Sequence, residues 1–288
     1  MKTPILVLSM LCLLLCLSPM SMAVEYDGPE IKRWTKMEKD DKGEMKEVKY
    51  MTIDGIMVHE DDPKIQPQPT VITPGTESSP ENAGTAPSDA IVLFDGSSLK
   101  SWTDTKGKKT KWKLDGGALS PTKVSGMIQT RQKFGSCQLH LEWATPGKTE
   151  GSGQGRGNSG VFLMGQYEVQ ILDNYRNTTY PDGQAGALYG RSKPLVNASR
   201  KPGEWQSYDI IFHRPVFENG EVVKRATFTV FHNGVLIQDH YELTGGTGWE
   251  GGSSISGYTP HADQGPLQLQ DHGNPVLFRN IWVRELED

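Results

Sequence analysis

The chain has few cysteines and a single long apolar run. Three cysteines occur among its 288 residues, and Cys12 and Cys16 lie within the apolar run from Ile5 to Leu17. Once that run is removed, Cys137 has no partner, so the folded domain must be stabilised by burial rather than by an internal disulfide. No later apolar stretch reaches the roughly 20 residues that a membrane-spanning helix requires.

The sequence also lacks an excess of positive charge. Its formal net charge is -5 at pH 7, whereas domains that bind nucleic acid or anionic membranes carry an excess of Lys and Arg. We therefore expect neither nucleic acid nor a membrane surface as a partner, and no transmembrane segment.

Residues 1–23 have the build of a secretory signal peptide. Lys2 precedes the apolar run. Ser21 and Ala23 place small residues at the third and the first position before the expected cleavage site. Neither Cys12 nor Cys16 follows the small residue that a lipoprotein cleavage site requires. We expect cleavage after Ala23 and export to the periplasm or the extracellular space, without a lipid anchor.

Two segments of different composition follow the signal peptide. Residues 24–60 are densely charged with both signs, and near their end Asp54-Gly55 lies between apolar residues, which is typical of a two-residue β-hairpin turn. Residues 61–88 are rich in Pro, Ser, Thr and Glu and offer little to bury. This composition predicts a linker.

Residues 89–288 consist of short alternating runs separated by glycine-containing turns. Examples are Gln138–Ala144, Tyr167–Leu172 and Gly265–Gln270, and Asn233-Gly234 is a strong hairpin signal. No part of this region shows three turns of helical period. Many strands without intervening helices predict an antiparallel all-β domain, either a sandwich or a barrel. We favour the two-sheet sandwich, because the alternation assigns one face of each strand to a core.

Several of these strands carry carboxylates and amides on one face. Alternation separates Glu142 from its apolar neighbours, and it does the same for Glu168 with Gln170 and for Gln268 with Gln270. Such groups suit the hydroxyls of a sugar, which both donate and accept hydrogen bonds. The pattern favours a saccharide site in which these strands present their polar side chains toward one shared hollow. A merely solvated outer face is the alternative.

Acid–base catalysis on a glycoside needs two carboxyl groups about 5 to 9.5 Å apart. Five residues of regular strand would place Glu168 and Asp173 about 17 Å apart and on opposite faces. Glu142, on a separate strand, could approach Glu168 as a cross-strand neighbour at ~5 Å, so we predict that pair. His272, beside Asp271 where a strand runs into a loop, is a candidate proton carrier or, alternatively, a tie that holds the loop.

The sequence gives little sign of a metal or a nucleotide. The histidines show no metal-ligand spacing, so we expect no zinc, although calcium held by Glu168, Asp173 and amides stays open. The glycine run from Gly151 to Gly160 contains a GxGxxG match, but a strand follows it where a dinucleotide fold would open a helix. We therefore expect this glycine run to form a loop over the strand face that would bind the sugar.

Several segments spread over residues 89–288 carry a specific resemblance. They are LFDGSSLKSW from Leu93, LHLEW from Leu139, GNSGVFL from Gly157, YEVQILD from Tyr167, GALYG from Gly186, GEW from Gly203, HNG from His232, GPLQLQDHG from Gly265 and VLFRNIWVREL from Val276. In these segments the chain resembles the 3-keto-disaccharide hydrolase domain family. The resemblance implies a jelly-roll sandwich of the concanavalin A-like lectin and glucanase type, with sugar on the concave face.

The resemblance also implies an activity, namely cleavage of glycosides that are oxidised to a ketone at C3. A base removes the C2 hydrogen that the ketone acidifies, the C1 group is expelled, and water adds to the product. On this basis we assign the proton transfers to Glu142 and Glu168, the enolate to Arg279 or a bound ion, and the leaving group to His272 with Asp271.

The candidates for binding the saccharide are polar or aromatic residues near these groups. They are Asn158, Gln170, Asp173, Tyr189, Gln268 and Gln270, with Trp205 as either a stacking or a core residue. A non-catalytic carbohydrate-binding module of the same fold is the alternative function.

Overall fold

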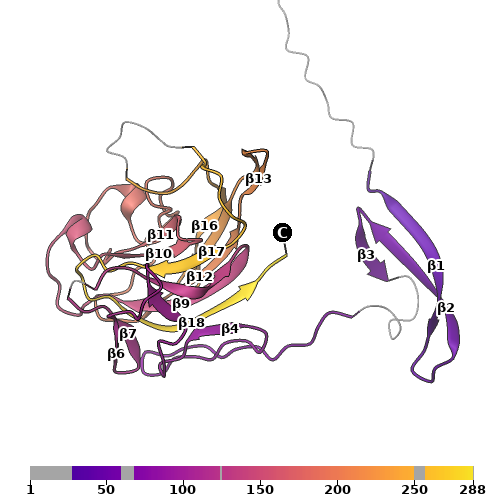
Figure 1. Cartoon of the computed structure of the whole chain (residues 1–288), viewed down its shortest axis with the longest axis horizontal. Helices are drawn as coiled ribbons and strands as arrows, with labels where there is room; N and C mark the ends of the chain where they lie inside the picture. Colours follow the sequence, from indigo (N-terminus) through magenta and orange to yellow (C-terminus); the bar gives the residue numbers. More distant parts are fainter. Residues whose placement is uncertain (1–27, 60–67, 124, 250–256, 288) are drawn as a thin grey trace, which may run out of the picture. The chain divides into compact units, whose positions relative to one another are not determined.

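The structure, a computed structural model, describes residues 28–59, 68–123, 125–249 and 257–287 (Figure 1). The chain divides into two compact units, Met1–Thr70 and Val71–Asp288, each of which is described by itself. The predicted signal peptide lies outside the described residues. Within the described ranges, no helix is long and apolar enough to cross a membrane.

The first unit contains a three-stranded antiparallel sheet. Its strands are β1 (Ile31–Lys39), β2 (Met45–Ile53) and β3 (Ile56–His59), in the order β1-β2-β3. The predicted hairpin at Asp54-Gly55 is confirmed, and both residues have the positive φ that its turn requires, 50° and 79°. Trp34 stacks on Tyr50 across the β1–β2 pair, with the ring centroids 5.5 Å apart.

The second unit is a sandwich of two antiparallel sheets, as predicted. Its strands are β4 (Ile91–Phe94), β5 (Trp102–Asp104), β6 (Lys113–Asp115), β7 (Ala118–Ser120), β8 (Ile128–Phe134), β9 (Cys137–Ala144), β10 (Ser159–Leu163), β11 (Tyr167–Ile171), β12 (Gln206–His213), β13 (Val216–Glu218), β14 (Glu221–Lys224), β15 (Thr227–His232), β16 (Val235–Glu242), β17 (Gly265–Leu269) and β18 (Leu277–Glu285). The two helical turns among the described residues are short 3₁₀ turns, η1 (Gly153–Gly155) and η2 (Pro181–Gly183).

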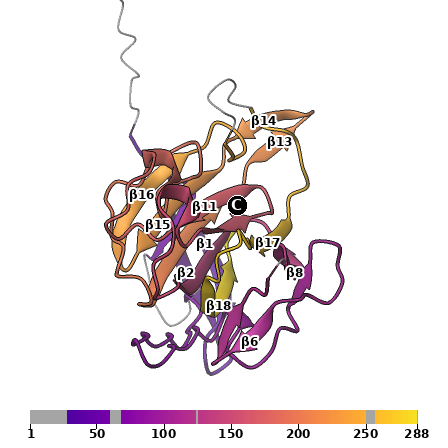
Figure 2. The ribbon, with the colours of Figure 1, turned by 90° about the vertical axis from the view of Figure 1, so that its left-hand side faces the viewer.

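The strands form one five-stranded and one eight-stranded sheet. The five-stranded sheet has the order β11-β10-β17-β8-β5, and the eight-stranded sheet has the order β16-β15-β12-β9-β18-β7-β6, with β4 also paired to β18. Strands β13 and β14 form a separate hairpin, which Figures 1 and 2 show at the end of this unit away from β6.

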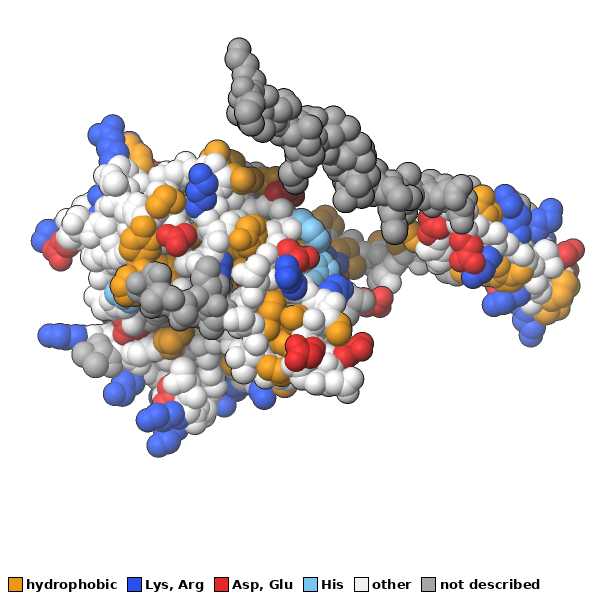
Figure 3. Space-filling model, turned by 90° about the horizontal axis from the view of Figure 1, so that it is seen from above, with side chains coloured by type: hydrophobic (Ala, Val, Ile, Leu, Met, Phe, Trp, Pro, Cys, Tyr) orange, Lys and Arg blue, Asp and Glu red, His pale blue; other side chains and the backbone are white. Residues whose placement is uncertain are grey.

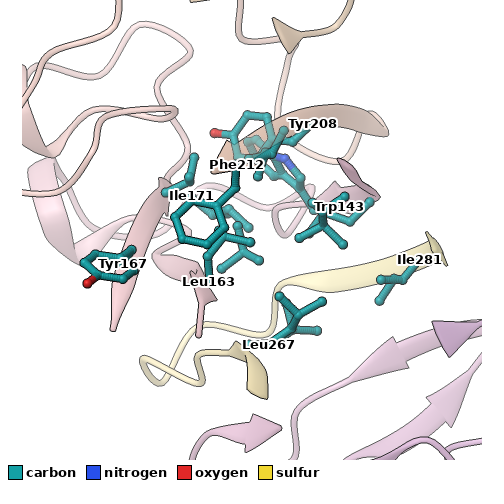
Figure 4. Packing of buried hydrophobic residues seen from close by; sticks show 14 of the residues in the cluster. Trp143, Leu163, Tyr167, Ile171, Tyr208, Phe212, Leu267 and Ile281 are labelled. Atoms are coloured by element: carbon teal, nitrogen blue, oxygen red, sulfur yellow. The ribbon is translucent and has the colours of Figure 1, made fainter. Parts of the chain in front are cut away.

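The core lies between the inner faces of the two sheets. Leu163, Ile171 and Leu267 come from the five-stranded sheet, and Trp143 and Tyr208 face them from the eight-stranded sheet (Figure 4). Every second side chain of a strand therefore points inward and the others point outward, as the alternation predicts. The outer positions of the two sheets consequently form two faces that point in opposite directions.

Several local predictions hold in detail. The predicted run Gln138–Ala144 lies within β9, and the hairpin at Asn233-Gly234 joins β15 to β16 with positive φ at both turn residues. Cys137 is a buried free thiol, and burial raises its pKa to about 12. On the surface seen in Figure 3, Lys and Arg side chains are interspersed with Asp and Glu.

The predicted linker differs from expectation in its second half. From Val71 onward the chain belongs to the sandwich unit, and in Figure 1 it runs past β18 and β4. Thr76 and Thr85 pair with each other, with Thr76 N donating to Thr85 O over 3.1 Å. Polar contacts rather than buried apolar side chains hold this segment, and composition gives no signal for such contacts.

Candidate functional site

The two predicted catalytic carboxylates lie on different sheets. Glu142 is on β9, which pairs with β12 and β18, whereas Glu168 is on β11, which pairs with β10. Both side chains take outward positions, so the hydrophobic core separates them. The prediction that they are cross-strand neighbours is wrong, and so is the prediction of one hollow shared by Glu142, Glu168, Gln268 and Gln270. The alternation gives the face of each strand but not the sheet to which the strand belongs.

We call the outer surface of the five-stranded sheet around Glu168 and Gln170 the amide face. Glu168 is opposite Phe162 on β10, and Gln170 is opposite Gly160. A Cβ atom at Gly160 would lie 2.3 Å from Oε1 of Glu168, so the carboxylate occupies the space that this glycine leaves open. This is the physical reason for glycine at position 160, whose φ is not positive.

The carboxylate of Glu168 is buried and unpaired. Glu168 is 6% exposed, and within the described residues its carboxylate accepts no hydrogen bond and meets no cation. Burial raises the pKa of this carboxyl to about 8, because no partner stabilises its charged form. A buried carboxyl that changes protonation near neutral pH is typical of a catalytic acid or base.

A second unpaired acceptor lies two residues along the same strand. The Nε2 group of Gln170 donates to Oε1 of Gln154 over 2.9 Å, whereas its own Oε1 is buried with no partner. Positions two residues apart on a strand are about 7 Å apart and on one face. Gln170 is 0% exposed, so its acceptor lies beneath the surface, and the 6% exposed Glu168 is the acceptor that a ligand with hydroxyl groups would meet first.

Two loops form a wall beside Glu168. The backbone N–H of Glu168 donates to Oγ1 of Thr247 over 2.7 Å, and the N–H of Tyr189 donates to the carbonyl of Glu168 over 3.2 Å. The N–H of Gly248 donates in turn to the carbonyl of Tyr189 over 3.0 Å, which ties the two loops together. The hydroxyl of Tyr189 shares a 2.6 Å hydrogen bond with that of Tyr180.

Five of the predicted binding residues lie on this side of the molecule with Glu168. Asn158 Nδ2 donates to the carbonyl of Gln154 over 2.7 Å, so Asn158 joins Gln170 through that residue. Gln268 lies across β10 and donates to Gln129 over 3.2 Å. The five are Asn158, Gln170, Tyr189, Gln268 and Gln270.

An exposed tryptophan next to this wall was not predicted from the sequence. Trp249 follows Gly248 directly and is 68% exposed. The surrounding sequence could have indicated its exposure. A Trp in a tract of glycine and serine has few apolar neighbours with which to form a core. A solvent-facing indole beside a polar site suits the CH faces of a sugar.

Two other predicted residues, Asp173 and Asp271, have partners elsewhere, and a third, His272, is exposed. Asp173 forms a buried ion pair with Arg156, with 2.7 Å between Oδ2 and Nε. Oδ2 of Asp271 accepts hydrogen bonds from the backbone N–H and the hydroxyl of Ser125, so this carboxylate holds a loop. His272 is exposed, and no hydrogen bond joins it to Asp271 within the described ranges.

The outer surface of the eight-stranded sheet around Glu142 is the second polar surface, here called the ion-pair face. Oε2 of Glu142 accepts from Nε of Arg279 over 2.7 Å, and Oε1 accepts from Nδ2 of Asn280 over 2.7 Å and from the hydroxyl of Ser78. Burial alone would raise the pKa of this carboxyl, but hydrogen bonds from His140, Ser78, Asn280 and Arg279 together lower it to about 2.

His140 and Trp205 complete the ion-pair face. Nδ1 of His140 lies 2.7 Å from Oδ1 of Asp209, and its ring stacks on Trp282 at 5.0 Å between centroids. Burial lowers the pKa of His140, but hydrogen bonds to Asp209 and Glu142 outweigh burial and raise it to about 9. The Arg279 guanidinium lies 4.3 Å from the Trp205 ring centroid. Arg279 therefore cannot reach a ligand at Glu168, and its predicted enolate role there is wrong.

Candidate metal ligands are sparse in the structure. The described part of the chain contains no group of three or more His, Cys, Asp or Glu side chains that could hold a metal ion. Asp173, one of the predicted calcium ligands, is committed to Arg156.

The fold, together with the family match and the relatives described next, indicates a carbohydrate-acting, hydrolase-like protein with a glycosyl hydrolase fold. Residues 89–284 match the family model of the 3-keto-alpha-glucoside-1,2-lyase-like domain, and the chain belongs to this family. The family is the one that the sequence motifs indicate.

Individual relatives agree with this assignment. A 3-keto-disaccharide hydrolase of Bacteroides thetaiotaomicron is 25% identical over 249 residues, which cover 68% of this chain and 78% of the relative. A solved structure from Parabacteroides distasonis, described as a candidate glycosyl hydrolase, is 48% identical with a TM-score of 0.72 and covers 77% of this chain and 93% of its own. A second structure from that organism, 20% identical with a TM-score of 0.50, covers 69% of this chain and 94% of its own and shares the fold.

Proposed function

We propose that the protein is an exported enzyme that cleaves 3-keto-glycosides on the amide face. The observation that carries the proposal is the buried Glu168 beside an amide-rich surface, which has no partner within the described residues and whose pKa burial raises to about 8. The name of the Bacteroides relative and the family description support this substrate class. Export is proposed from the N-terminal sequence pattern alone.

The proposed reaction begins with removal of the C2 hydrogen. In its charged form Glu168 takes this proton, which the C3 ketone makes acidic, and the C1–oxygen bond then breaks to expel the aglycone. Water adds to the resulting double bond, which completes a net hydrolysis. The buried position keeps competing water away from the charged carboxylate and strengthens it as a base.

The amides and phenols bind and orient the sugar in this mechanism. Gln268, which is partly exposed and lies on the same surface two strands away, binds a sugar hydroxyl, while the fully buried Gln170 positions Gln154 beside them. One hydroxyl proton is used within the pair of Tyr180 and Tyr189, so the other is free to bond to a sugar oxygen. These phenols are the closest candidates for protonating the leaving group.

The proposal is tested with matched substrates. The mature protein is incubated with a 3-keto-disaccharide and with its unoxidised parent, and released monosaccharide is measured. Product from the keto compound alone supports the proposal, product from the parent indicates an ordinary glycosidase, and binding without product indicates a carbohydrate-binding module.

The role of Glu168 is tested with two isosteric variants. Glu168→Gln should lower kcat/KM about 10² to 10⁴-fold, the usual contribution of a general base. Glu142→Gln, on the opposite face, should retain activity within a few-fold in protein whose near-UV circular dichroism is native. Full turnover by Glu168→Gln would remove this residue from the mechanism.

A further inference from the structure

A cleft with a volume of about 1000 Å³ lies over the ion-pair face. Its floor contains Glu142, His140, Asp209, Arg279 and Trp205, and none of these side chains can reach the amide face. The proposed reaction at Glu168 therefore leaves this cleft without a function.

The chain's own loop Thr76–Thr85 forms one wall of this cleft and bonds to residues of its floor. The hydroxyl of Ser78 donates to Oε1 of Glu142 and accepts from Nδ2 of Asn280 over 3.2 Å. The carbonyl oxygen of Ser79 accepts from Nη2 of Arg279 over 2.6 Å, and that of Pro80 accepts from Nη1 over 3.3 Å. The loop thus presents a hydroxyl that both donates and accepts, next to carbonyl oxygens held by a guanidinium.

The loop is held in place by polar contacts. Residues 77–84 read ESSPENAG, and all except Ser79 and Gly84 are exposed. Because little apolar surface is buried, the loop gains little from the hydrophobic effect, and a ligand could replace each of its hydrogen bonds. After such an exchange Glu142 and Arg279 would still pair with each other at 2.7 Å.

We propose that this cleft is a second ligand site, which binds a saccharide bearing an oxidised carbon next to a hydroxyl, and that the loop Thr76–Thr85 is an internal ligand competing for it. Glu142 and Asn280 bind the hydroxyl in the place of Ser78. The fork of Arg279 binds a carboxylate or keto oxygen in the place of the Ser79 and Pro80 carbonyls, and its planar donors suit such an oxygen better than a hydroxyl.

The loop can be shortened at its paired base, which ends its hydrogen bonds to Glu142, Arg279 and Asn280. Thr76 and Thr85 pair at its base, so a Gly-Gly turn can replace residues 77–84 in the full-length mature protein. Binding is followed by NMR of the tryptophan indole groups, with Trp205 and Trp282 assigned by substitution to Phe. The probes are glucuronic acid and 3-keto-glucose, which distinguish a carboxylate from a ketone, and glucose serves as the unoxidised control.

The loop-shortened protein should bind at least one oxidised probe about tenfold more tightly than the wild-type protein does, with shifts at Trp205 or Trp282, since competing hydrogen bonds are gone. Glucose should bind the loop-shortened protein about tenfold more weakly than the oxidised probe does. Adding Arg279→Lys to that protein should cancel most of the gain in affinity for the oxidised probe, because it removes the guanidinium fork. Three results would overturn the proposal: no indole shift in the folded variant, equal affinity with and without the loop, or binding that is indifferent to Arg279→Lys.

Discussion

Two buried glutamates on opposite faces of one sandwich behave in opposite ways. Glu142 is 2% exposed and Glu168 is 6% exposed, yet the pKa of the first is about 2 and that of the second about 8. Burial raises the pKa in both cases, and the difference lies in the partners. Glu142 accepts bonds from a guanidinium, an amide and a hydroxyl, whereas Glu168 has no partner within the described residues.

This difference separates a carboxylate whose charge is already compensated by protein partners from one whose charge has no such partner within the described residues. The partners of Glu142 compensate its desolvation, so its charge contributes to the folded state. Glu168 has no such partners within the described residues, so its burial disfavours the charged form and favours the protonated one. A carboxyl in this second situation is a stronger base than a solvated one, which is what removal of a carbon-bound proton requires.

The largest expected effect is on stability, at Glu142. Glu142→Ala leaves the Arg279 charge without its partner and should lower the free energy of unfolding by about 3 to 5 kcal/mol. Glu168→Gln should change it by less than about 0.5 kcal/mol at pH 7, because the amide resembles the protonated acid. Urea denaturation of both variants measures the contrast, and equal losses would show that the two carboxyls do not differ as described.

The next effect concerns the space beside Glu168. Gly160→Ala places a methyl group 2.3 Å from the present position of Oε1 and should displace the carboxylate. We expect kcat/KM to fall by about 10²-fold, the usual result of misplacing a catalytic group by ~1 Å. The matched control is Gly155→Ala, because a Cβ there meets nothing within 4 Å. If both variants were equally active, Gly160 would not position Glu168.

The pH dependence should sharpen the comparison further. Glu168 acts as a base when charged, so kcat/KM should rise with pH and level off above about 8. For stability the sign is opposite, because the pKa of Glu168 in the folded protein is raised above the ordinary value of 4.5 for a glutamate. The contribution of Glu168 to the free energy of unfolding is fully present below pH 4.5 and is lost as pH rises through 8. Glu168→Gln should remove that part of the slope in denaturation measured from pH 5 to 9, and an unchanged slope would contradict the assignment.

The smallest effect is expected from a single binding amide. Gln268→Ala should raise KM about 3 to 10-fold with little change in kcat, which corresponds to one neutral hydrogen bond. Gln138→Ala, on the eight-stranded sheet, should leave both constants unchanged. A fall in kcat alone would move Gln268 from binding to the chemical step.

The sequence was sufficient to predict strands such as β9, β11 and β17, the two hairpin turns and the inward-facing side chains of β9, but not β8, which lies inside the five-stranded sheet. It did not reveal that β9 pairs with β12 and β18 rather than with β11, because side-chain alternation is local whereas strand pairing depends on the packing of distant segments. The roles of Gly160 and Ser78 were also missed. A glycine that accommodates a carboxylate and a serine that bonds to the floor of a cleft are defined only by their neighbours in space.

The most direct test is a titration of the glutamate side chains by carbon-13 NMR of the carboxyl carbons, with Glu142 and Glu168 assigned by substitution to Gln. Glu168 should titrate near pH 8, while Glu142 should remain charged down to about pH 2 or until the protein unfolds. A Glu168 carboxyl that titrates near 4.5, like a solvated one, would contradict its assignment as the unpaired base of the amide face.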